Sequence, residues 1–306
     1  MKEQQALLSI VTPVFNSKFL LRALWENLDD QGYEALDWVL VNDGSTDEET
    51  LKILKEIEQT CDYAQVFHQE NGGAPKARNF GFTKIKGDFV KFLDADDLLA
   101  GNHLLAMAQQ CDVACPDQLL IAPQRIMHDY GDQKSESDVE LLEETYFEES
   151  IKNSLYRFSF HHSGCFFHRE LAGKNAWDES LKAFQDLDFL WQTMLLNPTF
   201  TLVNDTYFVN REHHYTNRIT TQKSPQKWLS RIKAVKRLND SLEAAGNPMK
   251  AAVAYRFNTL FLMAFFEDRQ SAQKILSEKK IEMGHKFDTN LFWRIFKEII
   301  KKIVRR

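Results

Sequence analysis

The chain has 306 residues, of which 43% are hydrophobic and 27% charged, and its formal net charge is −6 at pH 7. These values are typical of one large or two smaller globular domains, and they exclude a disordered chain and a collagen-like repeat. The acidic balance also argues against a protein that coats nucleic acid, because phosphate contacts require an excess of Lys and Arg.

The first hundred residues alternate short, apolar, β-branched segments with segments whose apolar residues recur at helical spacing. In chain order we expect a strand at 7–14, a helix at 17–31 with Ser17 as its N-cap, a strand at 38–41, a helix from 48 capped by Asp47, a strand at 64–67, a helix at 74–85 and a strand at 89–93. This alternation predicts right-handed βαβ crossovers and an α/β fold with a mostly parallel sheet flanked by helices.

The pattern is looser after residue 101. We expect a strand at 119–127, an acidic stretch at 129–149, a helix at 147–158, an extended segment at 165–168, a helix at 185–196 and a strand pair at 200–209. Only helical periodicities follow residue 225, at 228–242, 249–266 and 291–304. We therefore predict a mixed α/β domain at 1–220, with halves at 1–100 and 101–220, and a helical C-terminal region at 221–306.

Cysteine spacing and apolar runs indicate the cellular compartment. The four cysteines form no CxxC pair, and neither the N-terminus nor any later window contains the long uncharged apolar run of a signal peptide or membrane span. The sequence therefore predicts reduced thiols in a cytoplasmic protein that does not span a membrane.

Three polar clusters follow predicted strands, at 12–16, 42–47 and 94–97. Ligands of parallel sheets bind beyond the carboxyl ends of the strands. An acidic run such as Asp94 to Asp97 is often only a solvated loop, but carboxylates crowded at a strand end repel one another unless a divalent cation neutralises them. We therefore predict a site for Mg²⁺ or Mn²⁺ and a diphosphate at this end of the sheet.

Two further segments have ligand-binding chemistry. The Asp43 carboxylate, at a strand end, can accept a hydrogen bond from the imide N–H of a pyrimidine. The segment 71–79 combines Gly72 and Gly73 with the cations Lys76 and Arg78, which suits a diphosphate or its ribose. A plain glycine turn with a solvated cationic face is the alternative for that segment.

Together these motifs resemble the signature set of family 2 glycosyltransferases with the GT-A fold. They occur in the family's order, as Thr12-Pro13-Val14-Phe15-Asn16, Asn42-Asp43-Gly44-Ser45-Thr46-Asp47, Asn71-Gly72-Gly73 to Arg78-Asn79-Phe80-Gly81, and Phe92-Leu93-Asp94-Ala95-Asp96-Asp97. The resemblance makes 1–220 a catalytic domain, with 1–100 as its nucleotide-sugar half and 101–220 as its acceptor half. It covers the nucleotide-sugar half and leaves the C-terminal third unmatched. It implies a Rossmann-like GT-A sheet and an inverting transfer from a nucleotide sugar, usually a UDP-sugar, with Mn²⁺ or Mg²⁺.

The resemblance also implies residue roles. Asp43 would read the uracil, Asp94 would contact the ribose or sugar, and Asp96 would coordinate the metal. Thr12 and Pro13 would line the base pocket, and Arg78 would approach the nucleotide or the donor sugar. The remaining motif residues that would contact the donor are Asn16, Gly72, Gly73, Lys76 and Ala95.

Two family features lie downstream. The family places a Glu-Asp pair at the start of a helix, with the second acid as catalytic base. Here Gln185 replaces the Glu and Asp186 takes the place of the base, with Asp188 as an alternative. Arg211-Glu212-His213 resembles the family's Arg-x-His segment, in which His213 would complete the metal shell and Arg211 would meet the diphosphate. His161 and His162 have no metal spacing and are assigned to acceptor-site lining or plain surface.

The last predicted helix is basic and amphipathic. Its apolar stripe either lies on an anionic membrane, through residues 291–306, or packs against the helical region or a second subunit.

The sequence thus predicts a hexosyltransferase-type enzyme, on the cytoplasmic face of the membrane if peripheral, whose acceptor is a hydroxyl of a bacterial-type surface glycan, a glycoprotein or a lipid-linked glycan. The alternatives are a sugar nucleotidyltransferase and a glycosyltransferase-like module that binds nucleotide or glycan without turnover.

Overall fold

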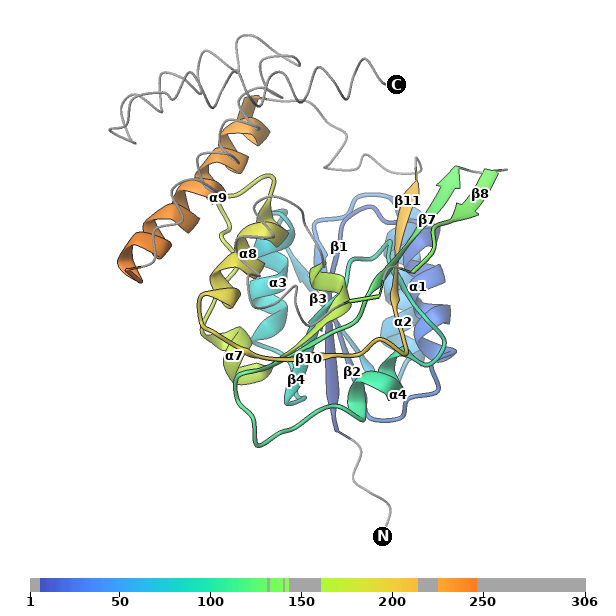
Figure 1. The fold of residues 1–306 in the computed structure, drawn as a ribbon. Helices are drawn as coiled ribbons and strands as arrows, with labels where there is room; N and C mark the ends of the chain where they lie inside the picture. The colour runs from blue at the N-terminus through green and yellow to red at the C-terminus, as the bar shows by residue number, and fades with distance from the viewer. Residues whose placement is uncertain (1–5, 131–132, 140, 143–160, 214–224, 247–306) are drawn as a thin grey trace.

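A computed structural model describes residues 6–130, 133–139, 141–142, 161–213 and 225–246. Seven strands form its main sheet in the order β10-β6-β9-β4-β1-β2-β3 (Figure 1). Their bounds are β1 (Leu8–Val14), β2 (Leu36–Asp43), β3 (Ala64–Gln69), β4 (Phe89–Phe92), β6 (Gln118–Ile121), β9 (Cys165–His168) and β10 (Thr199–Leu202). Only β9 is antiparallel to its neighbours β4 and β6; the other pairs in this sheet are parallel. The predicted mostly parallel α/β fold is confirmed.

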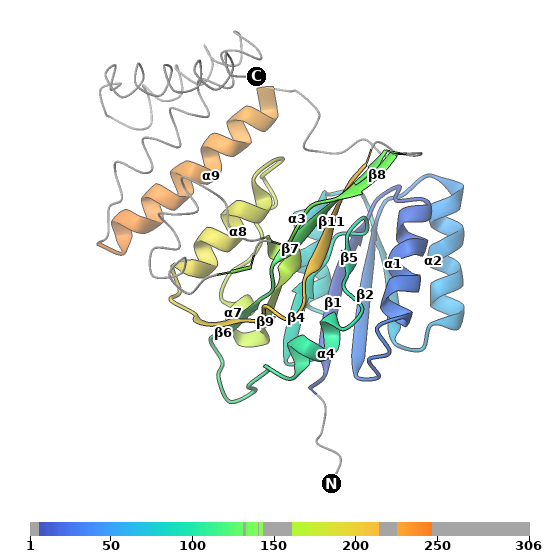
Figure 2. The same cartoon turned by 45° about the vertical axis from the view of Figure 1, so that its right-hand side comes forward.

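Helices cover both faces of this sheet, because successive side chains of a strand point to opposite faces. Ile10 packs in one core with the apolar faces of α1 (Phe19–Asp29), α2 (Glu48–Thr60) and α4 (His103–Ala108). Val11 packs in a second core with α3 (Ala74–Phe82), α7 (Arg169–Gly173) and α8 (Gln185–Met194). Figure 2 shows α1 and α2 on one side of the sheet and α3 and α8 on the other.

A second sheet has the order β5-β11-β7-β8, with β5 (Leu98–Leu99), β11 (Phe208–His213), β7 (Gln124–Tyr130) and β8 (Gln133–Glu136). It corrects one expectation, because the strand expected at 119–127 is two strands, β6 and β7, in different sheets. The strand pair expected at 200–209 is found as β10 and β11, of which β10 joins the first sheet and β11 the second.

The helix ends test the two predicted caps. Asp47 caps α2, since its Oδ1 accepts a hydrogen bond from the Thr50 N–H at 2.9 Å. The prediction for Ser17 was wrong. Helix α1 begins at Phe19, and its cap residue is Lys18, at φ 51°, whose side chain makes no capping bond. Asn16 and Lys18 both adopt positive φ here, and the Asn16 N–H donates to Ser45 Oγ, in the loop after β2, at 3.1 Å.

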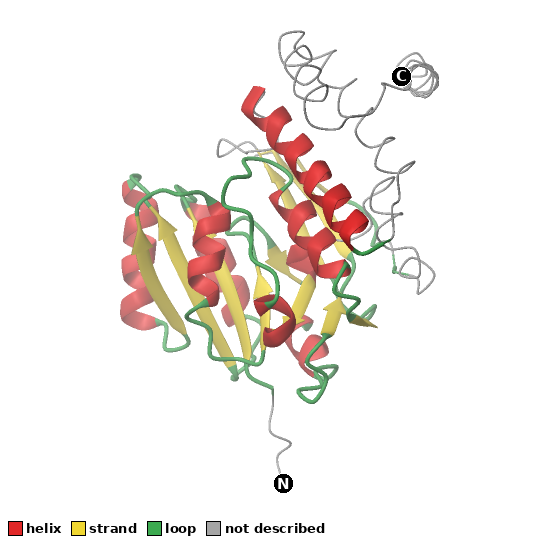
Figure 3. Cartoon of the chain, turned by 90° about the vertical axis from the view of Figure 1, so that its left-hand side faces the viewer, coloured by secondary structure: helices red, strands yellow, loops and turns green. Residues whose placement is uncertain are grey.

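Helix α9 (Pro225–Ala244) lies along α8 (Figure 3) and confirms the helix expected at 228–242. The boundary near residue 220 falls within 214–224, and the helices at 147–158, 249–266 and 291–304 also lie outside the described residues, so all four stay predictions. All four cysteines are free thiols. Among the helices that the structure describes, none is long and apolar enough to cross a bilayer.

Candidate active site

Strand register brings the polar loops together at one edge of the sheet. Val14 pairs with Asn42 and Asp43 with Gln69, so β1, β2 and β3 end side by side. Strand β4 ends beside them, where its Phe92 pairs with Val11. The three clusters predicted after these strands therefore share one edge, as the parallel sheet requires.

Asp43 is held in place by the glycine loop. Its Oδ1 accepts from the Gly72 N–H at 2.8 Å and from Gln69 Nε2 at 2.7 Å, and its Oδ2 accepts from the Gly73 N–H at 2.8 Å. Gly73 adopts φ 91°, a left-handed conformation that favours glycine. Among the bonds within the described part of the chain, Oδ2 accepts one, which leaves it a lone pair for a ligand N–H.

Asn16 and Thr12 bond to β2 and to the loop that follows it. The Asn16 side-chain oxygen accepts from the backbone N–H groups of Thr46 and Asp47, at 2.8 and 3.1 Å. Thr12 is fully buried, and its hydroxyl accepts from the indole N–H of Trp38 at 3.0 Å. The Thr12 side chain therefore ties β1 to β2 in the core beneath the predicted base pocket.

Asp94 lies at the centre of a charged cluster. Arg78 Nη2 donates to Asp94 Oδ1 at 2.5 Å, and His162 Nε2 lies 3.7 Å from the same oxygen. Partial desolvation would raise the pKa of the Asp94 carboxyl, but the charges of Arg78 and His162 outweigh it and hold this pKa well below its usual range. Asp94 is therefore a stable anion at the strand end.

Arg78 is itself fixed by an aromatic ring. Its guanidinium carbon lies 4.2 Å from the centroid of the Trp177 ring, which in turn stacks on Phe189 of α8 at 4.2 Å with an interplanar angle of 2°. The Asn79 side chain bonds both the N–H and the C=O of Trp177, each at 2.9 Å. Trp177 thus connects the cation of α3 to the helix that carries Asp186.

Asp96 and His213 form the pair that fits a divalent ion. His213 Nε2 lies 3.0 Å from Asp96 Oδ2, and carboxylate oxygen with imidazole nitrogen is a donor set that suits Mn²⁺. Burial, together with the charges of Asp96 and Asp94, raises the pKa of the neighbouring Asp97 carboxyl well above its usual range. This crowding of acids is what a bound cation would relieve. The backbone N–H of Arg211, a buried residue of β11, donates to Asp97 Oδ1 at 3.4 Å.

Asp186 and Asp188, near the start of α8, point in different directions, as a separation of two helical residues, about 200°, requires. Asp186 is 35% exposed, and its Oδ2 lies 3.8 Å from His161 Nε2. Asp188 is fully buried, and its Oδ2 accepts from Arg237 Nη1 of α9 at 2.5 Å. Despite Arg237, burial raises the pKa of Asp188 to about 6. Asp186 therefore faces the histidines and Asp188 the α9 interface.

A second group of potential metal ligands consists of His161, His162 and Asp186, with ligand atoms within 4.8 Å of one another. Its chemistry suits a cation less well than that of Asp96 and His213. His162 Nε2 already faces the Arg78 guanidinium at 3.4 Å, and the His161 Nδ1 accepts from the Ser163 N–H at 3.3 Å. A metal here would sit beside a fixed positive charge.

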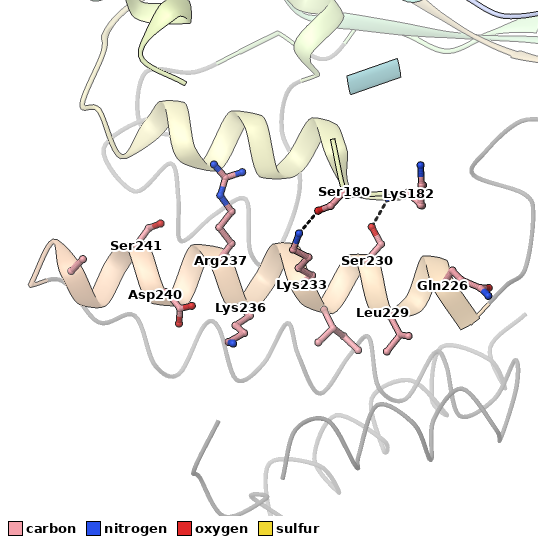
Figure 4. A pocket seen from close by; sticks show the side chains of 12 residues that line it. Ser180, Lys182, Gln226, Leu229, Ser230, Lys233, Lys236, Arg237, Asp240 and Ser241 are labelled. Carbon is pink, nitrogen blue, oxygen red and sulfur yellow. Dashed lines mark hydrogen bonds between the residues drawn. The ribbon is translucent and has the colours of Figure 1, made fainter. Parts of the chain in front are cut away.

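A cavity of about 870 Å³ borders α9 (Figure 4). Arg237 points from α9 toward α8, and Lys233 and Ser230 bond to Ser180 and Lys182 in the segment before α8. None of the site residues predicted from the sequence lines this cavity. Its lining residues come from α9 and from the segment before α8.

Most of the predicted residues meet at the same edge of the sheet, with Ala95 buried between Asp94 and Asp96 and with Lys76 exposed on α3.

Sequence reasoning missed two contributions. His161 and His162 were left as lining or surface, yet they lie between Asp94 and Asp186. Buried Lys91 of β4, whose pKa burial lowers to about 7, donates to the Ser163 carbonyl beside these histidines. The sequence did contain a signal for Lys91, because a charged residue inside an otherwise apolar strand indicates a buried charge with a specific partner.

The chain resembles solved structures over most of its length. TarS of S. aureus in complex with UDP-GlcNAc superposes with a TM-score of 0.63 at 18% identity, covering 89% of this chain and 80% of that one. The mannosyltransferase PcManGT of Pyrobaculum calidifontis, in complex with GDP-Man and Mn²⁺, gives a TM-score of 0.54 at 16% identity, covering 91% and 76%. At these identities the likeness establishes the GT-A fold.

Sequence relatives match a shorter region. Glycosyltransferase GlyG of Streptococcus pneumoniae serotype 4 is 35% identical over 106 residues, which are 34% of this chain and 35% of GlyG. Putative glycosyltransferase EpsH of Bacillus subtilis is 32% identical over 95 residues, 31% of this chain and 27% of EpsH. The chain thus aligns with about a third of the length of these relatives. The model of glycosyl transferase family 2 matches residues 9–174, more than half of the chain, and this protein belongs to that family.

Proposed function

We propose that the protein is a metal-dependent, inverting hexosyltransferase that moves a sugar from a UDP-sugar to a hydroxyl of a surface glycan, a glycoprotein or a lipid-linked glycan. One observation carries this proposal. Asp94 and Asp186, from distant parts of the sequence, converge on the adjacent His162 and His161, at 3.7 and 3.8 Å. Asp94 supplies an anion beside the candidate metal ligand Asp96, as donor binding needs. Asp186 supplies a partly exposed carboxylate, as base catalysis needs.

Family membership and the bound ligands of the structural neighbours support the donor class. TarS was solved with UDP-GlcNAc, and PcManGT with GDP-Man and Mn²⁺. In this chain Asp43 would accept from the uracil N3–H through Oδ2, while Arg78 and Asp94 would meet the ribose or the sugar. Pro13, Lys76 and Arg211 would contribute to the base and diphosphate contacts. Asp96 and His213 would hold Mn²⁺ or Mg²⁺, which supplies positive charge beside the departing diphosphate when bound.

The proposed reaction is a single displacement. The acceptor oxygen forms a bond to the anomeric carbon, and its proton passes to the Asp186 carboxylate. The bond between the anomeric carbon and the diphosphate oxygen breaks, and its electron pair leaves with UDP. Asp186 can serve because it is partly exposed and faces the histidines, whereas the Asp188 carboxylate is bound to Arg237.

Hydrolysis of a nucleotide-sugar panel with Mn²⁺ tests the reaction class. Slow release of UDP with water as acceptor is expected. Release of pyrophosphate from UTP and a sugar phosphate would indicate a nucleotidyltransferase, and tight UDP binding without any turnover would indicate a binding module.

Asp186→Asn tests the base. Because the amide keeps the shape of the side chain, we expect UDP affinity by calorimetry to stay unchanged while turnover falls by about 10² to 10⁴-fold. Asp188→Asn is the matched control, since the same change two residues away alters a carboxyl that faces α9. Loss of turnover in Asp188→Asn with an active Asp186→Asn would contradict the assignment.

A further inference from the structure

His161 and His162 are adjacent in sequence but face different partners. They precede β9, at the start of the 3₁₀ turn η1 (His162–Gly164), and their ring centroids are 4.2 Å apart. The His162 ring lies against Arg78 and Asp94, whereas the His161 ring stacks on Phe208 at 5.6 Å and faces Asp186. His162 thus lies on the predicted donor side, and His161 lies beside the candidate base.

The hydrogen-bond network assigns the proton on His161. The Ser163 backbone N–H donates to His161 Nδ1 at 3.3 Å, so Nδ1 carries a lone pair and no hydrogen. Burial, with the neighbouring His162 as the second cause, lowers the pKa of His161 to about 3. The ring is therefore neutral near pH 7, and its single hydrogen is on Nε2, the atom 3.8 Å from Asp186 Oδ2.

We propose that His161 is a positioning residue for Asp186: its Nε2–H engages Oδ2 and thereby leaves Oδ1 to receive the acceptor proton. This inference rests on the proposed function. The separation of 3.8 Å closes to a hydrogen bond through a small rotation of the partly exposed Asp186 side chain, as catalytic contacts do when substrate binds. His161 keeps its own proton throughout, so the acceptor proton ends on Asp186.

Two variants separate this role from a structural one. In His161→Asn the amide oxygen replaces Nδ1 and keeps the bond from the Ser163 N–H, but the side chain is too short to reach Asp186. In His161→Gln the amide N–H replaces Nε2–H and reaches Asp186, while the bond from Ser163 is lost. If His161 only caps the turn, turnover should be kept in His161→Asn and reduced in His161→Gln. If His161 positions the base, turnover should be reduced in His161→Asn and kept in His161→Gln.

The rate assay uses hydrolysis of UDP-GlcNAc, or of the UDP-sugar that the wild type hydrolyses fastest, with Mn²⁺. We expect His161→Asn to lower turnover by about 10 to 100-fold, the scale of a misplaced catalytic group, with unchanged UDP affinity by calorimetry. His161→Gln should keep most of the turnover. In an Asp186→Asn background His161→Asn should cost nothing further, because the two residues act as a unit. His162→Asn is the contrast, since it faces Arg78 and should weaken UDP binding.

A second readout needs no turnover. In ¹⁵N-histidine spectra, with His161 identified by its loss in His161→Asn, the ring should be the neutral Nε2–H tautomer from pH 5 to 8, and Asp186→Asn should shift its Nε2 signal. If no nucleotide sugar is hydrolysed, the proposed function fails, and the spectra still decide whether the His161 donor meets Asp186. An Nδ1–H tautomer, an Nε2 signal insensitive to Asp186→Asn, a fully active His161→Asn or an equal loss in His161→Gln would overturn the proposal.

Discussion

Asp188→Asn tests the ion pair between α8 and α9. The Asp188 carboxyl is fully buried and binds Arg237, and its pKa is raised from 3.8 to about 6 because burial outweighs the guanidinium charge. A native carboxyl with a raised pKa binds its proton more tightly than the unfolded chain does. Its contribution to the free energy of unfolding is therefore fully present below about pH 4 and is lost as the pH rises to about 6.

The size of that contribution follows from the pKa change. Each pKa unit corresponds to about 1.4 kcal/mol, which sets an upper limit of about 3 kcal/mol. Arg237 is 36% exposed, and its solvation allows the pair to relax, so we expect a loss of about 1 to 2 kcal/mol. The neutral amide of Asp188→Asn cannot titrate, and it retains an oxygen that accepts from Arg237.

The assay is urea unfolding at intervals from pH 4 to pH 7, followed by tryptophan fluorescence, for the wild type and Asp188→Asn. The wild type should lose stability relative to the variant across this range, while UDP-sugar hydrolysis of the two remains alike. In Arg237→Met the loss should extend to higher pH, because the partner that lowers the pKa is gone. A difference between wild type and Asp188→Asn that is flat, or that grows in favour of the wild type as the pH rises, would refute the reasoning.

Three further predictions concern the donor site and the sheet. Asp96→Ala should abolish Mn²⁺-dependent UDP binding in calorimetry, because it removes a carboxylate of the candidate metal pair; retained metal dependence would exclude Asp96 as a ligand. If Asp43 has the proposed role of accepting from the uracil N3–H, UDP should bind more tightly than CDP by about 1 to 3 kcal/mol, because cytosine offers no such donor, and equal affinities would contradict that role. Gly81→Ala should lower the free energy of unfolding by about 1 to 3 kcal/mol, because its Cβ would lie 2.5 Å from Val11 Cγ1, whereas Gly101→Ala, with no atom within 4 Å, should change little.

The sequence was most informative where one strand or helix carried a regular pattern. The apolar runs around Ile10, Leu40 and Val90 gave β1, β2 and β4, and Asp47 gave the start of α2. Strand endings then located Asp43 and Asp94, because parallel strands end at a common edge. Asp186 remains a prediction, supported by its orientation away from Arg237.

Other features depend on contacts that no local pattern encodes. The run at 119–127 reads as one strand, but Ala122 and Pro123 separate segments that pair in different sheets. Strands as short as Leu98–Leu99 carry no period to detect. His161 contacts Asp186, and Trp177 contacts Arg78 and Asn79, and these partners lie far away in the sequence. Long-range pairing decided those placements.

The reversed direction of β9 has a consequence for how the site tolerates change. The parallel strands place their site residues after their C-terminal ends, whereas the histidine pair lies before the N-terminal end of β9. The register of β9 therefore decides which histidine faces which carboxylate. A slip of one residue would send each side chain of β9 to the opposite face of the sheet and would displace the turn that carries the two rings. Gly164 opposes this slip, because the slip would place a residue with a side chain where Gly164 now lies. A Cβ at that position would lie 2.7 Å from the Ala122 carbonyl oxygen, which is too close. The different contacts of two neighbouring histidines thus depend on a residue that has no side chain of its own.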